Sequence, residues 1–469
     1  MVFASLEFLC LFLPFFLLLY ALVPRGWRNA TLMLSSWAFY AWWTPAFLTM
    51  LVGLTLLSWT GGLAIDRSTA RPTLRRWILI ALIAVNLGLL CFYKYVNIVV
   101  ANVNELLDWA GAVPIHWQKV VLPIGLSFIV LQAISYLVDV YRGTVKPTRS
   151  FIDFAAYKAM FGQLIAGPII RYAWVDKELV QRGLTWPQFG AGVRRFMVGM
   201  SMKVLVADTL SPLVATAFGL ENPSFVDAWI GCLAYSLQLF FDFAGYSAMA
   251  IGLGLMLGFH FPENFDNPYI ARNIQEFWRR WHLSLSTWIR DYLYIPLGGN
   301  RKGEVRTYVN LILTMALAGL WHGSDSWNFL LWGIAHGVAQ AGQRLWGRFG
   351  LPALPSVAAH VVTLLFVCLA WTLFRAPDWH VAAHMYAGQF GFNGFGLGDV
   401  LRLELRPVHA LAAALGVASI LFPEWYRRSH LSEKPGAIAL GYLWPLLGFA
   451  LAFALIASRG AVPFLYFQF

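Results

Sequence analysis

Residues 275–303, QEFWRRWHLSLSTWIRDYLYIPLGGNRKG, and residues 319–337, GLWHGSDSWNFLLWGIAHG, are the most informative parts of this chain. In the first stretch, aromatic side chains repeat along one helical face at 100° per residue, and polar and cationic side chains repeat along the opposite face. The aromatic face comprises Phe277, Trp281, Trp288 and Tyr292, and the polar face comprises Arg279, His282, Ser286 and Arg290. The spacing predicts one amphipathic helix, ended by Leu-Gly-Gly-Asn at 297–300, which lies at a membrane interface or lines a wet vestibule.

The composition around these stretches is that of an integral membrane protein. Of 469 residues, 59% are hydrophobic and only 12% are charged, whereas soluble domains carry about a quarter charged residues. Lys and Arg number 34 against 23 Asp and Glu. The excess lies mostly in short loops between apolar runs, as is typical of cytoplasmic loops that face anionic lipid. No basic region stands apart from the apolar runs, so nothing indicates nucleic-acid binding.

Apolar runs follow one another along the whole chain. Residues 2–23 are expected to form a retained helix. Arg25 and Arg28 follow it closely and place the N-terminus outside the cytoplasm. Thr44-Pro45 is expected to divide residues 30–65 into two helices. Further helices are expected at 77–93, 119–140, 189–218, 226–259, 357–374, 408–422 and 436–457.

One segment departs from this pattern. Residues 151–172 contain charged side chains together with Gly162, Gly167 and Pro168, so we expect a broken or re-entrant segment. We find no internal repeat and no separable soluble domain. The sequence therefore predicts an all-α, polytopic membrane protein with roughly 11–13 membrane-embedded helices. It forms a single domain over residues 1–469, with a catalytic core at about 226–345.

Three smaller features carry expectations of their own. Asp242, in an otherwise apolar run, should face the protein interior, because a carboxylate at membrane depth is costly. The aromatic tail FLYFQF, residues 464–469, could dock back onto the helices. His380 and His384 have an i, i+4 spacing, but two ligands are weak evidence and we predict no metal site.

His322, between Trp321 and Gly323, is a candidate general base. Burial favours the neutral imidazole, which accepts a proton from a hydroxyl near physiological pH. A structural histidine bonded to a backbone carbonyl explains the same residue, and the residues alone leave both interpretations open.

His282 has a weaker case from the residues alone. It shares its predicted face with Arg279 and Arg290, which indicates a wet interfacial residue rather than a catalyst. His336 is expected to pack or to form a structural hydrogen bond. The chain has no GxSxG, P-loop or HExxH motif, so soluble-hydrolase, nucleotide-hydrolysing and zincin functions lack support.

Taken together, residues 241–301 and the WHG motif at 321–323 resemble the membrane-bound O-acyltransferase (MBOAT) family, and most of all its bacterial alginate O-acetyltransferase branch. The resemblance runs nearly end to end. It also includes MVFASLEFLCLFLPFFLLLY at 1–20, SSWAFYAWW at 35–43, LIAGPIIRY at 164–172 and the terminal FLYFQF.

The resemblance implies a function and a site. His322 would be the catalytic base on the acceptor hydroxyl, and His282 would orient the donor thioester or polarise its carbonyl. Arg279, Arg290 and Lys302 are candidates for attracting the donor's phosphates, although such cations also suit anionic lipid. No cofactor is expected beyond acetyl-CoA, the probable acetyl donor.

The implied protein is a bacterial inner-membrane O-acetyltransferase. By this resemblance we expect it to pass acetyl from a cytosolic donor across the membrane to an exopolysaccharide, with alginate as the expected polysaccharide, together with extracytoplasmic acetyltransferase partners. The alternatives are acetylation of cellulose or peptidoglycan, or a transporter of the acyl donor that performs no chemistry, since broken helices with polar residues also suit transporters.

Overall fold

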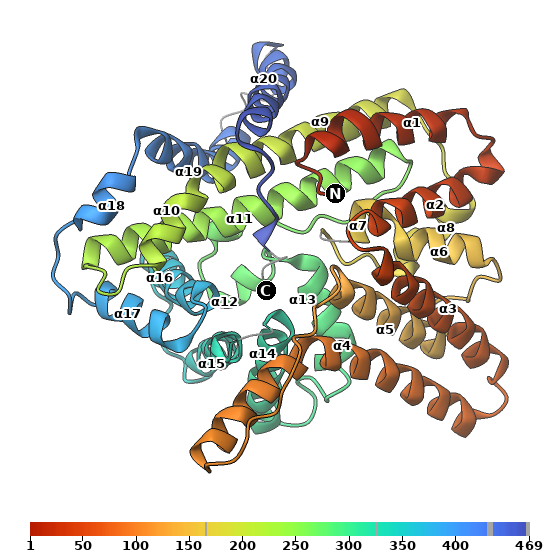
Figure 1. Cartoon of the computed structure of the whole chain (residues 1–469), viewed down its shortest axis with the longest axis horizontal. Helices are drawn as coiled ribbons and strands as arrows, with labels where there is room; N and C mark the ends of the chain where they lie inside the picture. Colours follow the sequence, from red (N-terminus) through yellow and green to blue (C-terminus); the bar gives the residue numbers. More distant parts are fainter. Residues whose placement is uncertain (165–166, 324–325, 429–434, 466–469) are drawn as a thin grey trace. The chain divides into compact units, whose positions relative to one another are not determined.

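The computed structural model describes residues 1–469 except 165–166, 324–325, 429–434 and 466–469. All regular elements in the described parts are helices (Figure 1). The chain divides into two compact units. The first comprises residues 1–195 and 249–262, and the second comprises residues 196–248 and 263–469. The helices α9 (Trp186–Ser201) and α11 (Phe225–Met256) contribute residues to both units.

In the first unit, helices α3, α4 and α5 pack against one another (Figure 1). The predicted division at Thr44-Pro45 is confirmed, because Pro45 occupies the first turn of α3, where its missing N–H costs nothing. The elements of this unit are η1 (Glu7–Phe12), α1 (Leu13–Leu22), η2 (Arg25–Trp27), α2 (Arg28–Ala41), α3 (Pro45–Arg67), α4 (Pro72–Trp109), α5 (Leu126–Arg142), α6 (Phe151–Ala159), α7 (Phe161–Leu164) and α8 (Tyr172–Val180).

Helix α4 is much longer than the predicted segment 77–93. Two asparagines on its second half bind the chain that returns beside it. The amide of Asn104 bonds both backbone groups of Ile115, at 2.7 and 3.1 Å, and the Asn97 amide bonds both backbone groups of Val120, at 2.8 and 3.0 Å. These polar side chains satisfy the backbone of an adjacent segment.

The predicted interruption of residues 151–172 is confirmed in the described part of this segment. Three short helices, α6, α7 and α8, replace a single span, and Met160 between the first two has a non-helical conformation. Lys158 on α6 is fully buried and donates to the backbone carbonyl of Ile129. Residues 165 and 166 lie outside the described residues.

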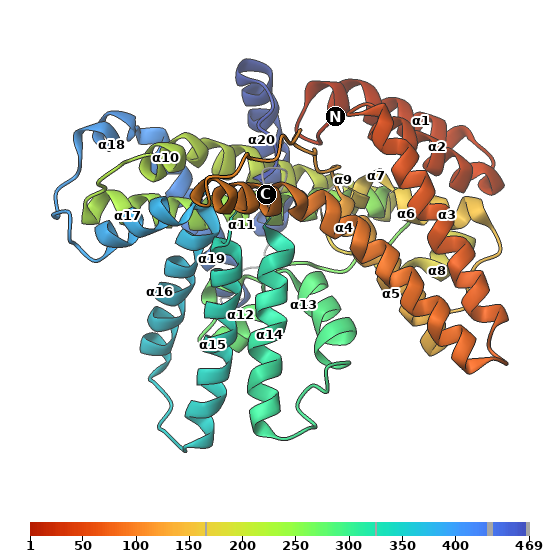
Figure 2. The same ribbon diagram turned by 60° about the horizontal axis from the view of Figure 1, so that its bottom comes forward.

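In the second unit, α14, α15 and α16 run alongside one another (Figure 2). The elements of this unit are η3 (Met202–Ala207), α10 (Asp208–Phe218), η4 (Pro268–Ile270), α12 (Ile274–Trp278), α13 (Leu283–Ile289), η5 (Arg290–Tyr294), α14 (Glu304–His322), α15 (Asn328–Arg348), α16 (Ser356–Arg375), α17 (Trp379–Gln389), α18 (Asp399–Glu404), α19 (Pro407–Arg428) and α20 (Pro435–Arg459).

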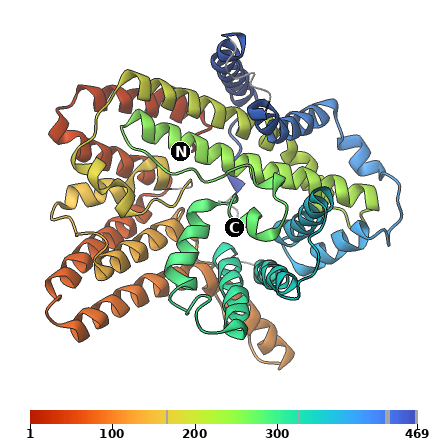
Figure 3. The same ribbon diagram turned by 180° about the vertical axis from the view of Figure 1, so that it is seen from behind.

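After α20 the chain returns to α11 (Figure 3). The Leu465 N–H donates to the Asp242 carboxylate at 2.8 Å, and Lys203 Nζ, 3.4 Å from the same carboxylate, donates to Val462 O at 3.0 Å. Asp242 is buried and Phe464 is 2% exposed, so both the interior position of the carboxylate and the docking of the tail are confirmed as far as residue 465. Residues 466–469 lie outside the described part.

Five helical stretches are long and apolar enough to cross a membrane. They are Pro45–Arg67, Pro72–Trp109, Trp186–Phe218, Phe225–Met256 and Ser356–Arg375. Together with the all-helical architecture of the described residues, they confirm the predicted class, a polytopic α-helical membrane protein. The larger expected number, 11–13 membrane-embedded helices, includes shorter and broken helices and stays a prediction.

Candidate active site

The stretch that suggested a single amphipathic helix is broken, and that prediction is wrong. Helix α12 ends at Trp278, α13 begins at Leu283, and a π-helical turn follows at Arg290–Tyr294. His282 stands in the break with φ +45° and ψ +56°, in the left-handed region. The two halves therefore do not share one pair of faces, and His282 does not belong to a continuous cationic face.

The conformation of His282 is costly. Among the residues described, only Asn267 and His282 have a positive φ without being glycine. A side chain with a Cβ is strained in this region, by on the order of 1–3 kcal/mol. Strain of this size persists only where the surrounding structure enforces it, and such residues cluster at functional sites.

The His282 side chain is buried rather than wet. It is 1% exposed, and the Phe243 ring stands edge-on to it at 4.6 Å between ring centroids. Its Nδ1 lies 3.1 Å from Asn264 Oδ1. Burial lowers the pKa of His282 to about 3, so the imidazole is neutral throughout the physiological pH range. The prediction that His282 is exposed to water is therefore wrong, because the ring is neutral and buried among aromatic side chains.

His322 is the last residue of α14 and is 6% exposed. Three aromatic rings surround it, with centroids 4.9 Å away for Trp321, 5.3 Å for Trp332 and 5.2 Å for Phe374. The imidazole of His322 is therefore enclosed by aromatic rings on several sides. Trp321 belongs to α14 itself, while Trp332 lies on α15 and Phe374 lies on α16.

Glycines allow α14 and α15 to approach closely beside His322. An added Cβ at Gly319 would lie 2.2 Å from Phe329 O, and one at Gly333 would lie 2.3 Å from Met315 O. Small residues are the usual means by which membrane helices reach such distances. The position of His322 therefore depends on the absence of side chains at these glycines.

Both histidines belong to the second unit and join one cluster of aromatic rings. The residue before His282, Trp281, lies 4.9 Å from Trp371, which in turn contacts Trp332 at 5.8 Å and Phe374 at 5.4 Å. Those last two rings are neighbours of His322. The structure thus connects the two predicted catalytic residues through shared aromatic packing.

His336 has the structural role that the sequence predicted. It is completely buried on α15, and its Nδ1 accepts a hydrogen bond from Trp278 Nε1 at 3.2 Å. The bond ties α15 to α12, just ahead of the break.

The candidate phosphate-binding residues are less closely associated. Arg279 and Lys302 are exposed. Arg290 is exposed as well, and its guanidinium pairs with the neighbouring Asp291 at 2.7 Å.

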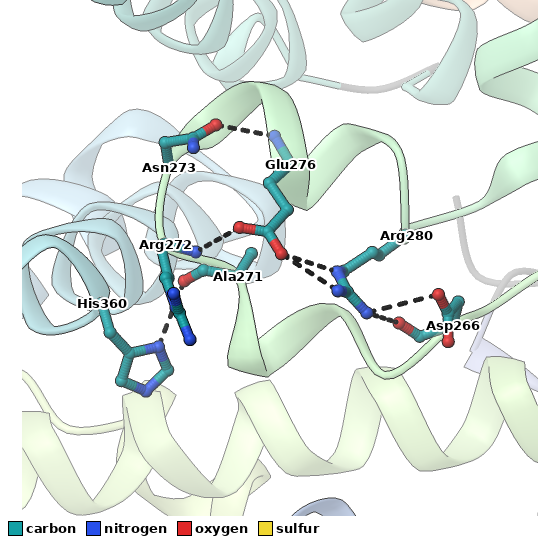
Figure 4. Close-up of polar contacts among 7 residues, drawn as sticks. All are labelled: Asp266, Ala271, Arg272, Asn273, Glu276, Arg280 and His360. Carbon is teal, nitrogen blue, oxygen red and sulfur yellow. Dashed lines mark hydrogen bonds and ion pairs between the residues drawn. The ribbon is translucent and has the colours of Figure 1, made fainter. Parts of the chain in front are cut away.

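Arg280, which was not among the predicted site residues, connects the two sides of the break (Figure 4). Its guanidinium pairs with Glu276 at 3.0 Å and reaches both the backbone oxygen and the carboxylate of Asp266, at 3.1 and 3.3 Å. Glu276 also accepts from the Arg272 N–H, while the Asn273 side chain caps α12 through the Glu276 N–H. The asparagine–glutamate spacing at 273 and 276 was the available signal.

The same close-up shows His360 of α16 against this turn, with Nδ1 3.1 Å from the Ala271 carbonyl (Figure 4). His380 and His384 are exposed on α17. Within the described ranges, no group of three or more His, Cys, Asp or Glu side chains is arranged to hold a metal ion.

The helices, the apolar spans and the buried histidines define a multi-pass membrane protein with a water-poor candidate site. The chain belongs to the membrane-bound O-acyltransferase family, whose family model matches residues 145–374. It is 42% identical to a probable alginate O-acetylase of Pseudomonas putida over the full length of both chains. A second probable alginate O-acetylase, from Pseudomonas syringae, is 40% identical, again over all of both chains.

A peptidoglycan O-acetyltransferase of Helicobacter pylori is 36% identical, over 80% of this chain and 75% of its own length. Family membership makes the chain an acyltransferase, so the alternative of a transporter without chemistry loses its support.

Proposed function

We propose that this protein is an inner-membrane O-acetyltransferase that moves acetyl from cytosolic acetyl-CoA toward an exopolysaccharide, namely alginate. The observation that carries the proposal is His322, a buried histidine at the end of α14 inside a wall of aromatic rings. The full-length similarity to probable alginate O-acetylases, at 40–42% identity, supports this acceptor over peptidoglycan, for which the similar relative is 36% identical over part of its length.

In the proposed reaction, His322 takes the proton of the acceptor hydroxyl while the hydroxyl oxygen forms a bond to the carbonyl carbon of the thioester. The carbon–sulfur bond then breaks, the acetyl group remains on oxygen as an ester, and the proton passes from the imidazolium to the leaving thiolate. General-base help of this kind is worth about 10²–10⁴-fold in rate, or roughly 3–5 kcal/mol of barrier.

The remaining roles follow from the site. His282 orients the donor, while Arg279, Arg290 and Lys302 attract its phosphates from their exposed positions. Residues 1–469 work as one catalytic domain with its core at about 226–345. Extracytoplasmic acetyltransferase partners receive the acetyl group, so the polysaccharide need not be the direct acceptor.

Replacement of His322 tests the proposal. Purified His322→Gln and His322→Ala should consume labelled acetyl-CoA at no more than about a hundredth of the wild-type rate, the lower bound for loss of a general base. Both should retain near wild-type yield. His336→Gln is the matched control, because glutamine can still accept from Trp278 Nε1 and activity should persist. A folded His322→Gln enzyme with more than about a tenth of the wild-type rate would contradict the general-base role.

A further inference from the structure

The left-handed turn at His282 is held against a second short segment, residues 264–266. The Leu283 N–H donates to the Asn264 carbonyl at 2.9 Å, and the Asp266 N–H donates to the Arg280 carbonyl at the same distance. Backbone bonds therefore lie on both sides of His282. Together with the Arg280–Asp266 contacts, they enforce a conformation that the histidine would not adopt alone.

The Asn264 side chain within this arrangement has only one possible orientation. One of its terminal atoms receives the Ser284 backbone N–H at 3.2 Å and the Ser284 hydroxyl at 2.9 Å. A backbone N–H can only donate, so this atom is the carbonyl oxygen Oδ1. The other atom, Nδ2, then donates to Ser247 Oγ at 3.1 Å, which is consistent with the same orientation.

This orientation fixes the tautomer of His282. Its Nδ1 faces Asn264 Oδ1 at 3.1 Å, and an amide oxygen can only accept, so Nδ1 carries the proton. The Ser284 hydroxyl is 3.5 Å from Nδ1 but 2.9 Å from Asn264 Oδ1, to which it donates. In a neutral imidazole the other nitrogen, Nε2, is then a bare lone pair.

That lone pair is buried and unsatisfied. Nε2 of His282 has no hydrogen-bond partner among the described residues, while the residue is 1% exposed. A buried acceptor without a donor destabilises the folded protein. Such an atom, on a strained residue held by a dedicated network, indicates a place where a ligand's N–H or O–H group binds.

We propose that Asn264 is a positioning residue that holds His282 in its Nδ1–H tautomer and presents Nε2 as a hydrogen-bond acceptor to a substrate N–H or O–H group. The assignment rests on the proposed function. It also narrows the role of His282. An Nε2 without a proton cannot donate to the thioester carbonyl, so His282 orients an amide N–H of the donor or a hydroxyl of the acceptor, and does not polarise the carbonyl.

The tautomer is measured directly by ¹⁵N NMR of the full-length protein labelled at histidine, with the His282 signals assigned by their loss in His282→Asn. Wild-type protein should show a protonated Nδ1 and an unprotonated Nε2. A protonated Nε2 overturns the proposal whether or not the protein transfers acetyl, so this readout is independent of the proposed function.

Kinetics supply the second arm. Asn264→Ala should lower kcat by between about tenfold and 10⁴-fold, the upper figure being the loss when a catalytic histidine takes the wrong tautomer. Asn264→Asp keeps an acceptor opposite Nδ1 and should recover most of that loss at pH 8. Ser247→Ala is the control, since it removes a partner of Nδ2 only, and it should keep the wild-type tautomer and rate within about threefold.

The variants also separate positioning from folding, and donor from acceptor. If Asn264→Ala and Asn264→Asp lose activity equally, in step with their thermal midpoints, Asn264 is structural and the proposal fails. A raised KM for acetyl-CoA in Asn264→Ala identifies the donor's N–H as the group bound by Nε2. A raised KM for the hydroxyl acceptor alone identifies its O–H.

Discussion

Replacing Gly333 by alanine should separate α15 from α14 and displace His322. An ideal Cβ at Gly333 lies 2.3 Å from Met315 O and 3.1 Å from Ala316 Cα. Ordinary contact begins at 3.4 Å, so the helices must move apart by about 1.1 Å, the difference between 3.4 and 2.3 Å. The opposing atoms belong to the backbone, and no change of rotamer relieves the clash.

The structural cost of this change is moderate and its catalytic cost is large. Overpacking lowers the free energy of unfolding by about 1–3 kcal/mol, and the better helix propensity of alanine raises it by about 1 kcal/mol. Gly333→Ala should therefore still fold. A misplacement of about 1 Å in a catalytic group is worth on the order of 10²-fold in rate. We therefore expect kcat to fall by about two decades.

Gly342 of the same helix provides the matched control, because no heavy atom lies within 4 Å of an ideal Cβ there. Gly342→Ala should keep the wild-type kcat and show an equal or higher thermal midpoint. The assay compares turnover of labelled acetyl-CoA and thermal midpoint for both purified variants. If Gly333→Ala turns over as fast as Gly342→Ala, close packing of α14 and α15 does not set the position of His322.

Two further predictions concern charges. Arg279→Gln and Arg290→Gln should raise KM for acetyl-CoA with little change in kcat, because loss of uniform binding alters KM. The effect should be smaller at Arg290, whose charge Asp291 already offsets, and an unchanged KM in both variants would leave these arginines as lipid anchors. Asp242→Ala should lower the thermal midpoint and speed proteolysis of the C-terminal segment, because Lys203 loses a buried partner. Wild-type resistance to protease would show that Asp242 does not anchor the tail.

Strong local signals in the sequence predicted the fold well. Length and apolar composition located most of the long helices, and the proline at position 45 marked the start of α3. Asp242 in the apolar run of α11 was expected to face the interior, and there its carboxylate lies against Lys203 and the returning chain. The proline acts on the helical turn that contains it, and the position of Asp242 follows from the cost of burying one charge. Both signals can be read from the local sequence.

Long-range hydrogen bonds account for the prediction that failed in α4. The predicted helix ended at residue 93, and Asn97 and Asn104 lie beyond it, on the second half of α4. Their partners, Val120 and Ile115, follow 23 and 11 residues later. A hydropathy scale counts every asparagine as polar. It does not include the hydrogen bonds that a distant backbone segment can form with the asparagine amide.

The prediction of a continuous helix through His282 failed for a different reason, and this failure bears on function. The spacing of residues 275–292 satisfies a helical repeat, so periodicity predicts a helix there. The break comes from Asn264 and Asp266, whose bonds to Ser284 and Arg280 were not visible in the spacing. The resemblance to the family identified His282 as a candidate, but the pattern placed it on a wet face.

The corrected position changes the chemistry that His282 can perform. On a cationic helix face it would be solvated, near arginines, and free to take either tautomer. In the break it is dry and neutral, and the Asn264 amide determines which nitrogen carries the proton. Arg280, beside this break, pairs with Glu276 and Asp266. Because the helix is broken at His282, the side chain is held in one orientation and Nε2 is its hydrogen-bond acceptor. The strain of the left-handed turn is the energetic cost of that orientation.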